Sequence, residues 1–479
     1  MVATTLPLLA ALLGVMGYAS AAGVQAFAVD STVDAVDAAP GDGRCATAAG
    51  ACTLRAAVQE VEALPVVPGA GREIVVPAGL YRLTIPAGGE LTSSQPVVAA
   101  GDLDVTKRVT ITGAGADRTV IDGTGAHRMI DVHANGFART SRVALRNGRA
   151  EHSGPTGHVH GGAIHNHGVL ELLESTVSDS VAQAGSPWGG GGITNAGNGT
   201  ATLRNVTIAK NGTTYFGGAV ENGGPMTMTN VTVTANTAPA GQGAGIASGV
   251  GFFGGSGAAA ASLQSTIVTG NGPGGNDCRD RPSPTITSNG NNLQGAGTCP
   301  FLHPNDPIPA NPQLAEIPGA LGSVFVYGLS PGSPAIDRSF TCPPIDERGV
   351  TRPQEGDGVS PALCDIGAYE LEPPGSTCDG ATATVVGTAG RDRLRGTNGP
   401  DVIVGLGDDD RIEGRGGDDR ICGGDGSDRI DGGPGADRIF GDAGNDDLSG
   451  GPDVDFIDGG DGRDRCRRST STVRCEDVE

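Results

Sequence analysis

Nine consecutive nonapeptides, from Gly387 to Arg467, decide the fold of the C-terminal part of the chain. Written in nines without a gap, they read GTAGRDRLR, GTNGPDVIV, GLGDDDRIE, GRGGDDRIC, GGDGSDRID, GGPGADRIF, GDAGNDDLS, GGPDVDFID and GGDGRDRCR. This fixed register argues against an acidic disordered tail, because disorder requires no nine-residue period. We therefore expect one small structural unit per nonapeptide, stacked on its neighbours.

Two positions of the repeat carry its core and its chemistry. Position eight is Ile or Leu in eight repeats and Cys in the ninth, which provides a thin apolar core. Position six is always Asp, in a glycine-rich turn whose main-chain carbonyls can point inward. Ca²⁺ prefers about six to eight hard oxygen ligands, which carboxylates and carbonyls supply. The predicted calcium ligands are Asp392, Asp401, Asp410, Asp419, Asp428, Asp437, Asp446, Asp455 and Asp464.

The pattern resembles the RTX, or haemolysin-type, calcium-binding repeat, G-G-x-G-x-D-x-U-x. The resemblance implies a parallel β-roll in which six residues turn around an ion and three form a short strand. Consecutive turns would lie on opposite edges, with each ion between turn n and turn n+2, so nine turns offer at most seven sites. Asp408 and Asp453 replace Gly at position four, where Asp tolerates the left-handed backbone expected there.

A longer period runs through the middle of the chain. Motifs of one kind, GGAIHN, GGGITN, GGAVEN and GAGIAS, start 29, 27 and 26 residues apart, and a strand-like run follows each. Such a period is one rung of a parallel β-helix, in which equivalent side chains stack in columns. The predicted buried columns are Ile164, Ile193, Val220 and Ile246, and Val177, Ile208, Val233 and Val268. A ladder of Asn at a left-handed corner is expected at Asn211, Asn236 and Asn271.

Segments at both ends of this body resemble known modules. Cys52-Thr-Leu-Arg-Ala-Ala-Val is similar to the CSLREA module of bacterial secreted and surface β-helix proteins, with Ala56 in place of the family's Glu. Its apolar spacing predicts one short helix that ends near Leu64 and caps the coil. Blocks that begin at Leu329, Asp346 and Cys364 resemble the closing segment of the choice-of-anchor Q family. The resemblance implies a secreted right-handed β-helix with no single assigned chemistry.

The chain is therefore expected to be all-β, a right-handed parallel β-helix followed by an RTX parallel β-roll. The predicted parts are a signal peptide (1–26), a CSLREA-like cap segment (27–70), the β-helix with its closing segment (71–372), a linker (373–386), the β-roll (387–467) and a C-terminal tail (468–479).

The net charge and the N-terminus indicate export. The charge of 32 minus 54, or −22, argues against nucleic acid and anionic membranes as partners. An apolar run from Leu6 to Met16, with small-residue cleavage options that end at Ala21 or Ala26, is typical of a secretory signal. No Lys or Arg precedes the run, so a misassigned start or an uncleaved anchor is the alternative. No other apolar stretch is long enough to span a bilayer.

Ten cysteines without a paired Cys-x-x-Cys zinc pattern indicate disulfides in an exported chain. Sequence order favours local pairs among the many connectivities that ten cysteines allow. The expected pairs are Cys45 with Cys52, Cys278 with Cys299, Cys342 with Cys364, Cys378 with Cys422, and Cys466 with Cys475.

Five of the eight histidines lie between His152 and His167. Strand alternation puts His158 with His160, and His165 with His167, on common faces, a spacing suited to a transition metal or a substrate. The simpler interpretation is that His165 and His167, which flank Asn166, are exposed turn residues.

Two functions remain from the sequence. The favoured one is a secreted, calcium-stabilised surface or adhesion protein, whose partners besides calcium would be glycans or cell-surface components. The alternative is an extracellular polysaccharide lyase or hydrolase that acts on the lateral face of the β-helix. No catalytic residue is predicted, because the chain has neither a His-Glu-x-x-His pattern nor a closely spaced aspartate set like that of polygalacturonases.

Overall fold

The computed structural model describes residues 25–66, 72–86, 101–151, 160–183, 189–249, 259–272, 277–280, 285–295, 298–307, 309–318, 325–330, 332–340, 342–350, 352–353, 363–371, 377–388, 390–467, 471–475 and 477–478. The apolar run of the expected signal peptide, His152 and His158 lie outside these residues.

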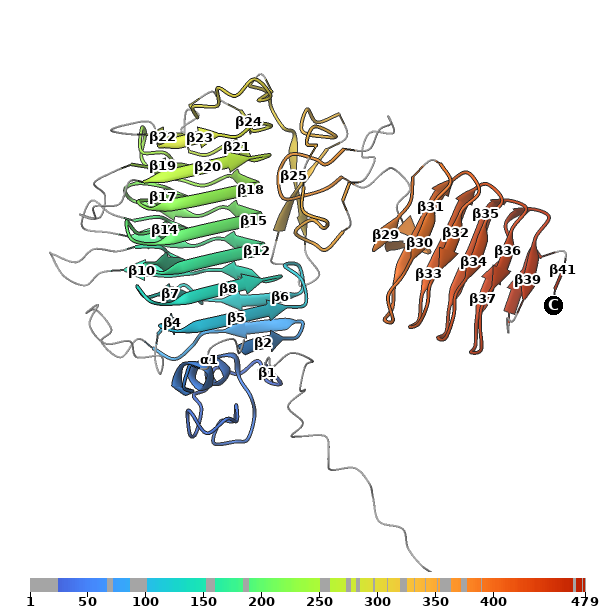
Figure 1. Ribbon diagram of the computed structural model, residues 1–479, viewed down its shortest axis with the longest axis horizontal. Helices are drawn as coiled ribbons and strands as arrows, with labels where there is room; N and C mark the ends of the chain where they lie inside the picture. The colour runs from blue at the N-terminus through green and yellow to red at the C-terminus, as the bar shows by residue number, and fades with distance from the viewer. Residues whose placement is uncertain are drawn as a thin grey trace, which may run out of the picture.

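Parallel strands stacked rung upon rung form the β-helix (Figure 1). The longest path is β1 (Gln25–Ala28), β2 (Arg72–Val76), β5 (Arg108–Gly113), β8 (Phe137–Ser141), β12 (Val169–Ser178), β15 (Thr200–Ala209), β18 (Pro225–Thr234), β20 (Ala260–Gln264) and β23 (Ile286–Ser288). The same sheet includes β3 (Gly79–Arg82), β6 (Thr119–Asp122), β9 (Ala144–Arg146), β21 (Ile267–Thr269) and β24 (Leu293–Gln294).

Two further sheets complete the coil. One contains β4 (Leu103–Val105), β7 (Ile130–Val132), β11 (Ile164–Asn166), β14 (Ile193–Asn195), β17 (Val220–Asn222), β19 (Ile246–Ser248) and β22 (Cys278–Asp280). The other contains β10 (Arg149–Glu151), β13 (Val181–Gln183) and β16 (Gly212–Thr213). Every neighbouring pair in these sheets is parallel, as the period near 27 residues requires.

Both predicted apolar columns are confirmed. Ile164 pairs with Ile193 in register, and Val177 pairs with Ile208. All eight predicted residues are fully buried, and they belong to one apolar core that also contains Leu103 and Ile130 from earlier rungs. The coil therefore obtains its stability from stacked aliphatic side chains rather than from a large globular core.

An asparagine ladder forms at the corner of the coil, as predicted. Asn211 Nδ2 donates to Asn236 Oδ1 at 3.0 Å, and Asn236 Nδ2 donates to Asn271 Oδ1 at 2.9 Å. The predicted left-handed backbone lies one residue earlier, with φ of 58° at Lys210 and 56° at Ala235. The turn thus precedes each Asn, whose buried amide can then bond main-chain atoms of two rungs.

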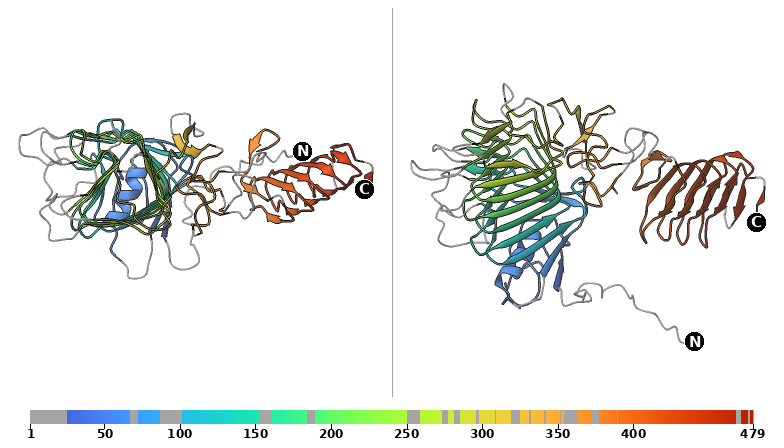
Figure 2. Two further views of the ribbon diagram at one scale, coloured as in Figure 1. Left: turned by 90° about the horizontal axis from the view of Figure 1, so that it is seen from above. Right: turned by 45° about the horizontal axis from the view of Figure 1, so that its top comes forward.

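A short helix lies at the N-terminal end of the coil (Figure 2). Helix α1 (Leu54–Ala63) begins after Thr53, whose side chain accepts a hydrogen bond from the Ala56 main-chain N–H. Its C-cap is Leu64, so it ends near Leu64 as expected. The buried guanidinium of Arg55 pairs with Asp34 at 2.7 Å. Among the described residues, no helix is long and apolar enough to cross a membrane.

The closing segment differs from the expected continuation of the coil. It contains an antiparallel pair, β25 (Leu314–Pro318) and β26 (Phe325–Leu329), instead of another parallel rung. Its main chain bonds the coil strands laterally, for example from Ala368 N–H to Thr232 Oγ1 at 3.0 Å. Ile336 and Ile366 pack there against Ile267 and Leu293 of the last rungs. The segment therefore covers one side of the coil.

The β-roll consists of two parallel sheets (Figure 1). One contains β29 (Val385–Val386), β31 (Val402–Gly407), β33 (Arg420–Asp425), β35 (Arg438–Gly444), β37 (Phe456–Asp458), β38 (Asp461–Gly462) and β40 (Ser471–Val473). The other contains β30 (Arg393–Arg395), β32 (Arg411–Glu413), β34 (Arg429–Asp431), β36 (Asp447–Ser449), β39 (Arg465–Arg467) and β41 (Asp477–Val478). Alternate repeats thus lie on opposite sheets, and the position-eight side chains form the core between them.

Strands of the roll extend into the stretches expected as linker and tail. Strand β29 precedes the first nonapeptide, and β40 and β41 follow the ninth. A hairpin of β27 (Thr377–Cys378) and β28 (Ala381–Thr382) precedes β29 in the chain. Asp379 in its turn pairs with Arg438 Nε, so this segment is fastened to the roll.

All five predicted disulfides are present, and the described residues contain no free cysteine. The Cys378–Cys422 bond joins the hairpin of β27 and β28 to strand β33 of the roll. The Cys466–Cys475 bond closes its other end.

Candidate functional site

The position-six aspartates form two buried rows, one along each edge of the roll. Each Asp directly precedes the strand of its repeat, where the glycine-rich turn ends. Eight of the nine are buried, the partly buried Asp392 being the first. Burial of so many carboxylates is costly unless each is paired with a cation or fully hydrogen-bonded.

One carboxylate oxygen of each later aspartate is bonded to the turn two repeats before it. The Asp392 N–H donates to Asp410 Oδ1 at 2.7 Å, and the Asp410 N–H donates to Asp428 Oδ1 at 2.8 Å. The same bond, at 2.8 to 2.9 Å, links 401 to 419, 419 to 437, 428 to 446, 437 to 455 and 446 to 464. These seven links join the turn pairs n and n+2 that the repeat pattern predicts as calcium sites.

The second carboxylate oxygen remains for a ligand. Oδ2 is buried and has no hydrogen-bond donor among the described residues in Asp410, Asp419, Asp428, Asp437 and Asp446. Asp455 and Asp464 have the same bond at Oδ1 and are equally buried. A buried anionic oxygen without a donor fits a hard cation, because Ca²⁺ is bound through such oxygens.

Burial also changes the acidity of these groups. It raises the pKa of Asp410, Asp419 and Asp446 to about 7, and neighbouring carboxylates add to the effect. The same cause raises the pKa of Asp428 and Asp437 to about 6. Carboxylates that lose their charge so readily in a fold without metal would be held ionised by a bound cation.

The turn requires glycine at its first position because the aspartate carboxylate lies too close to the glycine backbone for a Cβ atom. At Gly432 an added Cβ would collide with Asp437 Oδ2 of the same turn, and at Gly423 with Asp428 Oδ2. Left-handed backbone recurs at position four, with φ of 134° at Gly426. Asp408 replaces Gly at the same position and adopts φ of 66°, as expected for Asp. The same expectation is wrong for Asp453, which is not among the described residues with positive φ.

The first two of the nine predicted ligands differ from the rest. Asp392 Oδ2 accepts hydrogen bonds from the Thr388 N–H and from Thr388 Oγ1 at 2.9 Å. Asp401 Oδ2 accepts the same pair from Thr397, with Oγ1 at 3.0 Å. Thr stands at position two only in these repeats. These carboxylates therefore have protein donors at the oxygen that the following aspartates leave open.

Comparison with known families agrees with this geometry. Residues 386–421, 423–457 and 431–466 match the family model of the RTX calcium-binding nonapeptide repeat (4 copies). The roll is a calcium-binding unit. The RTX match covers this roll and not the β-helix, and no curated protein and no solved structure matches the chain.

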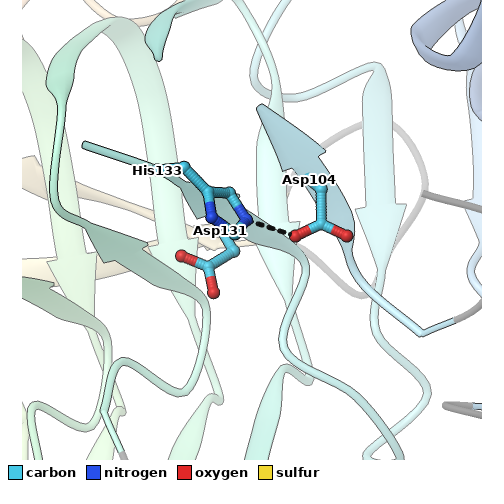
Figure 3. Close-up of side chains that lie close together, drawn as sticks. All are labelled: Asp104, Asp131 and His133. Atoms are coloured by element: carbon cyan, nitrogen blue, oxygen red, sulfur yellow. Dashed lines mark hydrogen bonds and ion pairs between the residues drawn. The ribbon is translucent and has the colours of Figure 1, made fainter. Parts of the chain in front are cut away.

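A second group of ligand-type side chains lies on the β-helix, at residues that the sequence analysis did not select. Asp104, Asp131 and His133 present ligand atoms that all lie within 4.8 Å of one another (Figure 3). Leu103-Asp-Val and Ile130-Asp-Val, 27 residues apart, are the sequence signal that could have indicated them.

Of the histidines that the sequence analysis did select, His160, His165 and His167 are described, and His165 contacts this group. His165 Nδ1 lies 3.4 Å from Asp131 Oδ1, and the ring of His165 stacks on that of His160. His167 is near the surface, with Nδ1 3.0 Å from Asn198 Oδ1. The exposed-turn interpretation is wrong for His165, which is buried.

Proposed function

We propose that this protein is a secreted, calcium-dependent surface or adhesion protein, in which the RTX roll folds on Ca²⁺ and the β-helix presents the partner-binding surface. The observation that carries the calcium part is the row of buried Asp Oδ2 atoms without donors. In this proposal the ions lie between turns n and n+2 and bind Asp410, Asp419, Asp428, Asp437, Asp446, Asp455 and Asp464. Asp392 and Asp401 close the first end of the roll through their threonines.

Calcium supplies folding free energy in this proposal. From Gly387 to Arg467 there are 19 Asp, one Glu and 11 Arg, so the net charge is 11 minus 20, or −9. Fixing the backbone costs about 1–2 kcal/mol per residue, and the core is a single row of aliphatic side chains. Bound cations neutralise the carboxylates and offset that cost. Extracellular calcium would therefore fold the roll after export.

The disulfides support the secretion part of the proposal, because such bonds persist in oxidising compartments. Strand β1 bears on the cleavage point, since Ala26 lies inside it, paired with Glu73, and Phe27 is buried. Cleavage after Ala21 leaves this strand whole, whereas cleavage after Ala26 would cut it. N-terminal sequencing of the protein recovered from culture medium tests the cleavage point. Absence of the protein from the medium would oppose secretion.

Glu221 is a candidate acid for the alternative function, a polysaccharide-active enzyme, but its burial opposes that role. Burial raises the pKa of Glu221 to about 8, a value suited to a general acid. However, Glu221 is fully buried and accepts hydrogen bonds from Gly189 N–H and Thr194 Oγ1, so its carboxyl has no access to a polysaccharide.

A glycan panel separates the two functions. Calcium-saturated protein should bind glycans or cell-surface material without releasing reducing ends or unsaturated uronates. Release of either product, absent from a heat-inactivated control, would instead establish the enzyme.

A further inference from the structure

We propose that the β-helix binds one divalent transition metal ion of the zinc class at Asp104, Asp131 and His133. The roll selects a hard ion with oxygen ligands alone, whereas this group combines two carboxylates with an imidazole, a set that suits zinc-like ions. The site is independent of the proposed adhesion function.

Register places the ligands on one outer face. Asp104 of β4, Asp131 of β7 and His165 of β11 occupy equivalent positions on successive rungs. Their strand neighbours, such as Ile130 and Val132, point into the core. Because side chains alternate along a strand, the aspartates and His165 point outward, and His133, two residues beyond Asp131, follows on the same side. The fold thus gathers ligands from separate rungs.

The charges around the group are unbalanced. Among the described residues, the arginine that pairs with Asp131 is Arg128, with a terminal nitrogen 2.6 Å from Asp131 Oδ2, and its Nε also lies 2.8 Å from Oδ2 of the neighbouring Asp102. The nearby guanidinium of Arg55 is paired with Asp34. Asp102 and Asp131 therefore share one guanidinium, and Asp104, which pairs with His133, adds a third carboxylate. A divalent ion would neutralise the two remaining negative charges.

A buried histidine supplies an independent observation. His165 contacts Asp131 and is more than nine-tenths buried. Its Nε2 has no hydrogen-bond partner among the described residues. A buried imidazole against a ligand carboxylate is the arrangement that orients ligands in metal sites. We assign Asp104, Asp131 and His133 as ligands and His165 as a positioning residue.

The position of His133 also allows a simpler explanation without a metal ion, since its Nε2 lies 2.6 Å from Asp104 Oδ1 (Figure 3). That contact alone could be an ion pair between a protonated imidazole and a carboxylate. A proton and a metal ion compete for this imidazole nitrogen, so the ion pair and the metal site exclude each other. Zinc binding therefore distinguishes them.

The test uses the full chain, stripped with EDTA and then saturated with CaCl₂ so that the roll is filled. Zn²⁺ is then added and the unbound ion is removed by dialysis. We expect each chain to retain about one Zn²⁺, which excess calcium should not displace. Asp104→Asn and His133→Gln should weaken zinc binding by at least about tenfold, as measured by titration calorimetry. The matched control is His303→Gln, in the segment after the coil, which should bind zinc as the parent does. Failure of the parent to retain zinc, or equal retention by folded variants, would overturn the site.

A measurement on the unmodified chain covers the case in which the variants do not fold. Diethylpyrocarbonate reacts with accessible imidazoles, and the His133 side chain is 28% exposed. Zn²⁺ should protect the peptide that contains His133, whereas the peptide with His303 stays reactive and Ca²⁺ protects neither. Unchanged reactivity of His133 in Zn²⁺ would refute the proposal.

Discussion

The main-chain N–H of Asp428 donates a hydrogen bond to Oδ1 of Asp446, 2.8 Å away, although the two residues are 18 positions apart. The bond holds the carboxylate of one turn against the turn two repeats before it. It also directs the remaining oxygen of Asp446 into buried space without a donor. Repetition of this bond along both edges is the basis of the following predictions.

Removal of one central carboxylate should weaken calcium binding. Asp428→Ala removes the acceptor for the Asp410 N–H and a buried ligand oxygen. We expect the calcium concentration at the midpoint of roll folding to rise by about tenfold. Asp431→Ala, an exposed aspartate in the same repeat, makes the same change in charge and serves as the control. Equal midpoints for the two variants in a calcium titration would show that only net charge matters.

The first end of the roll should depend less on its aspartates. Asp401→Ala removes a carboxylate that Thr397 already bonds, whereas Asp419→Ala, on the same edge, removes one with an open Oδ2. Calcium titration should therefore show a clearly smaller loss of affinity for Asp401→Ala. A loss as large as that of Asp419→Ala would mean that the first aspartates are ligands too.

Acidity should act in opposite directions with and without calcium. The folded pKa values of Asp410, Asp419, Asp428, Asp437 and Asp446, about 6 to 7, lie above the ordinary value of about 3.9. Without calcium, the folded roll takes up extra protons between about pH 4 and pH 7, so acidification stabilises it there and the gain is lost as the pH rises through the folded pKa. With calcium, protons compete for the same oxygens.

Titrations at about pH 7.5 and about pH 5.5 test this pH dependence. Calcium affinity should be weaker at the lower pH, while hydrogen exchange in EGTA, corrected for intrinsic rates, should show greater protection of the roll there. A calcium affinity that is independent of pH would contradict the assignment of these carboxylates.

The asparagine ladder should be important for the stability of the β-helix. Asn236→Ala leaves the carbonyls of Ile208 and Thr234 without their amide donor and breaks the link to Asn271. Each buried group left unsatisfied costs about 1–3 kcal/mol, so we expect a loss of about 3 kcal/mol or more in unfolding free energy. Asn289→Ala, at an exposed bond to Ser262, should change it by less than about 0.5 kcal/mol. Similar losses in calorimetry would disprove this role.

Periodicity explains what the sequence could predict. The columns of Ile164 and Val177, the rows of aspartates and the n to n+2 pairing all follow from fixed repeats, because a stacked coil brings equivalent positions together. The disulfide pairs followed from sequence order, since each joins cysteines that are consecutive in the chain.

Features without a period could not be predicted in the same way. The closing segment bonds the coil through contacts between distant residues, such as Ala368 with Thr232, which leave no local pattern. The group of Asp104, Asp131 and His133 lies on rungs that lack the glycine motif of the later ones, so the pair of Leu103-Asp-Val and Ile130-Asp-Val is a much weaker signal of their register. Thr388 donates to Asp392 through a hydrogen bond between two residues of a single turn, which the repeat pattern does not indicate.

Hydrogen–deuterium exchange on the full chain, in calcium and then in EGTA, tests the central claim most directly, because the β-helix serves as an internal reference. We predict that amides of residues 390–467 are protected in calcium and exchange rapidly in EGTA, while strands β15 and β18 remain protected in both. Equal protection of residues 390–467 in EGTA would contradict a roll that folds on calcium.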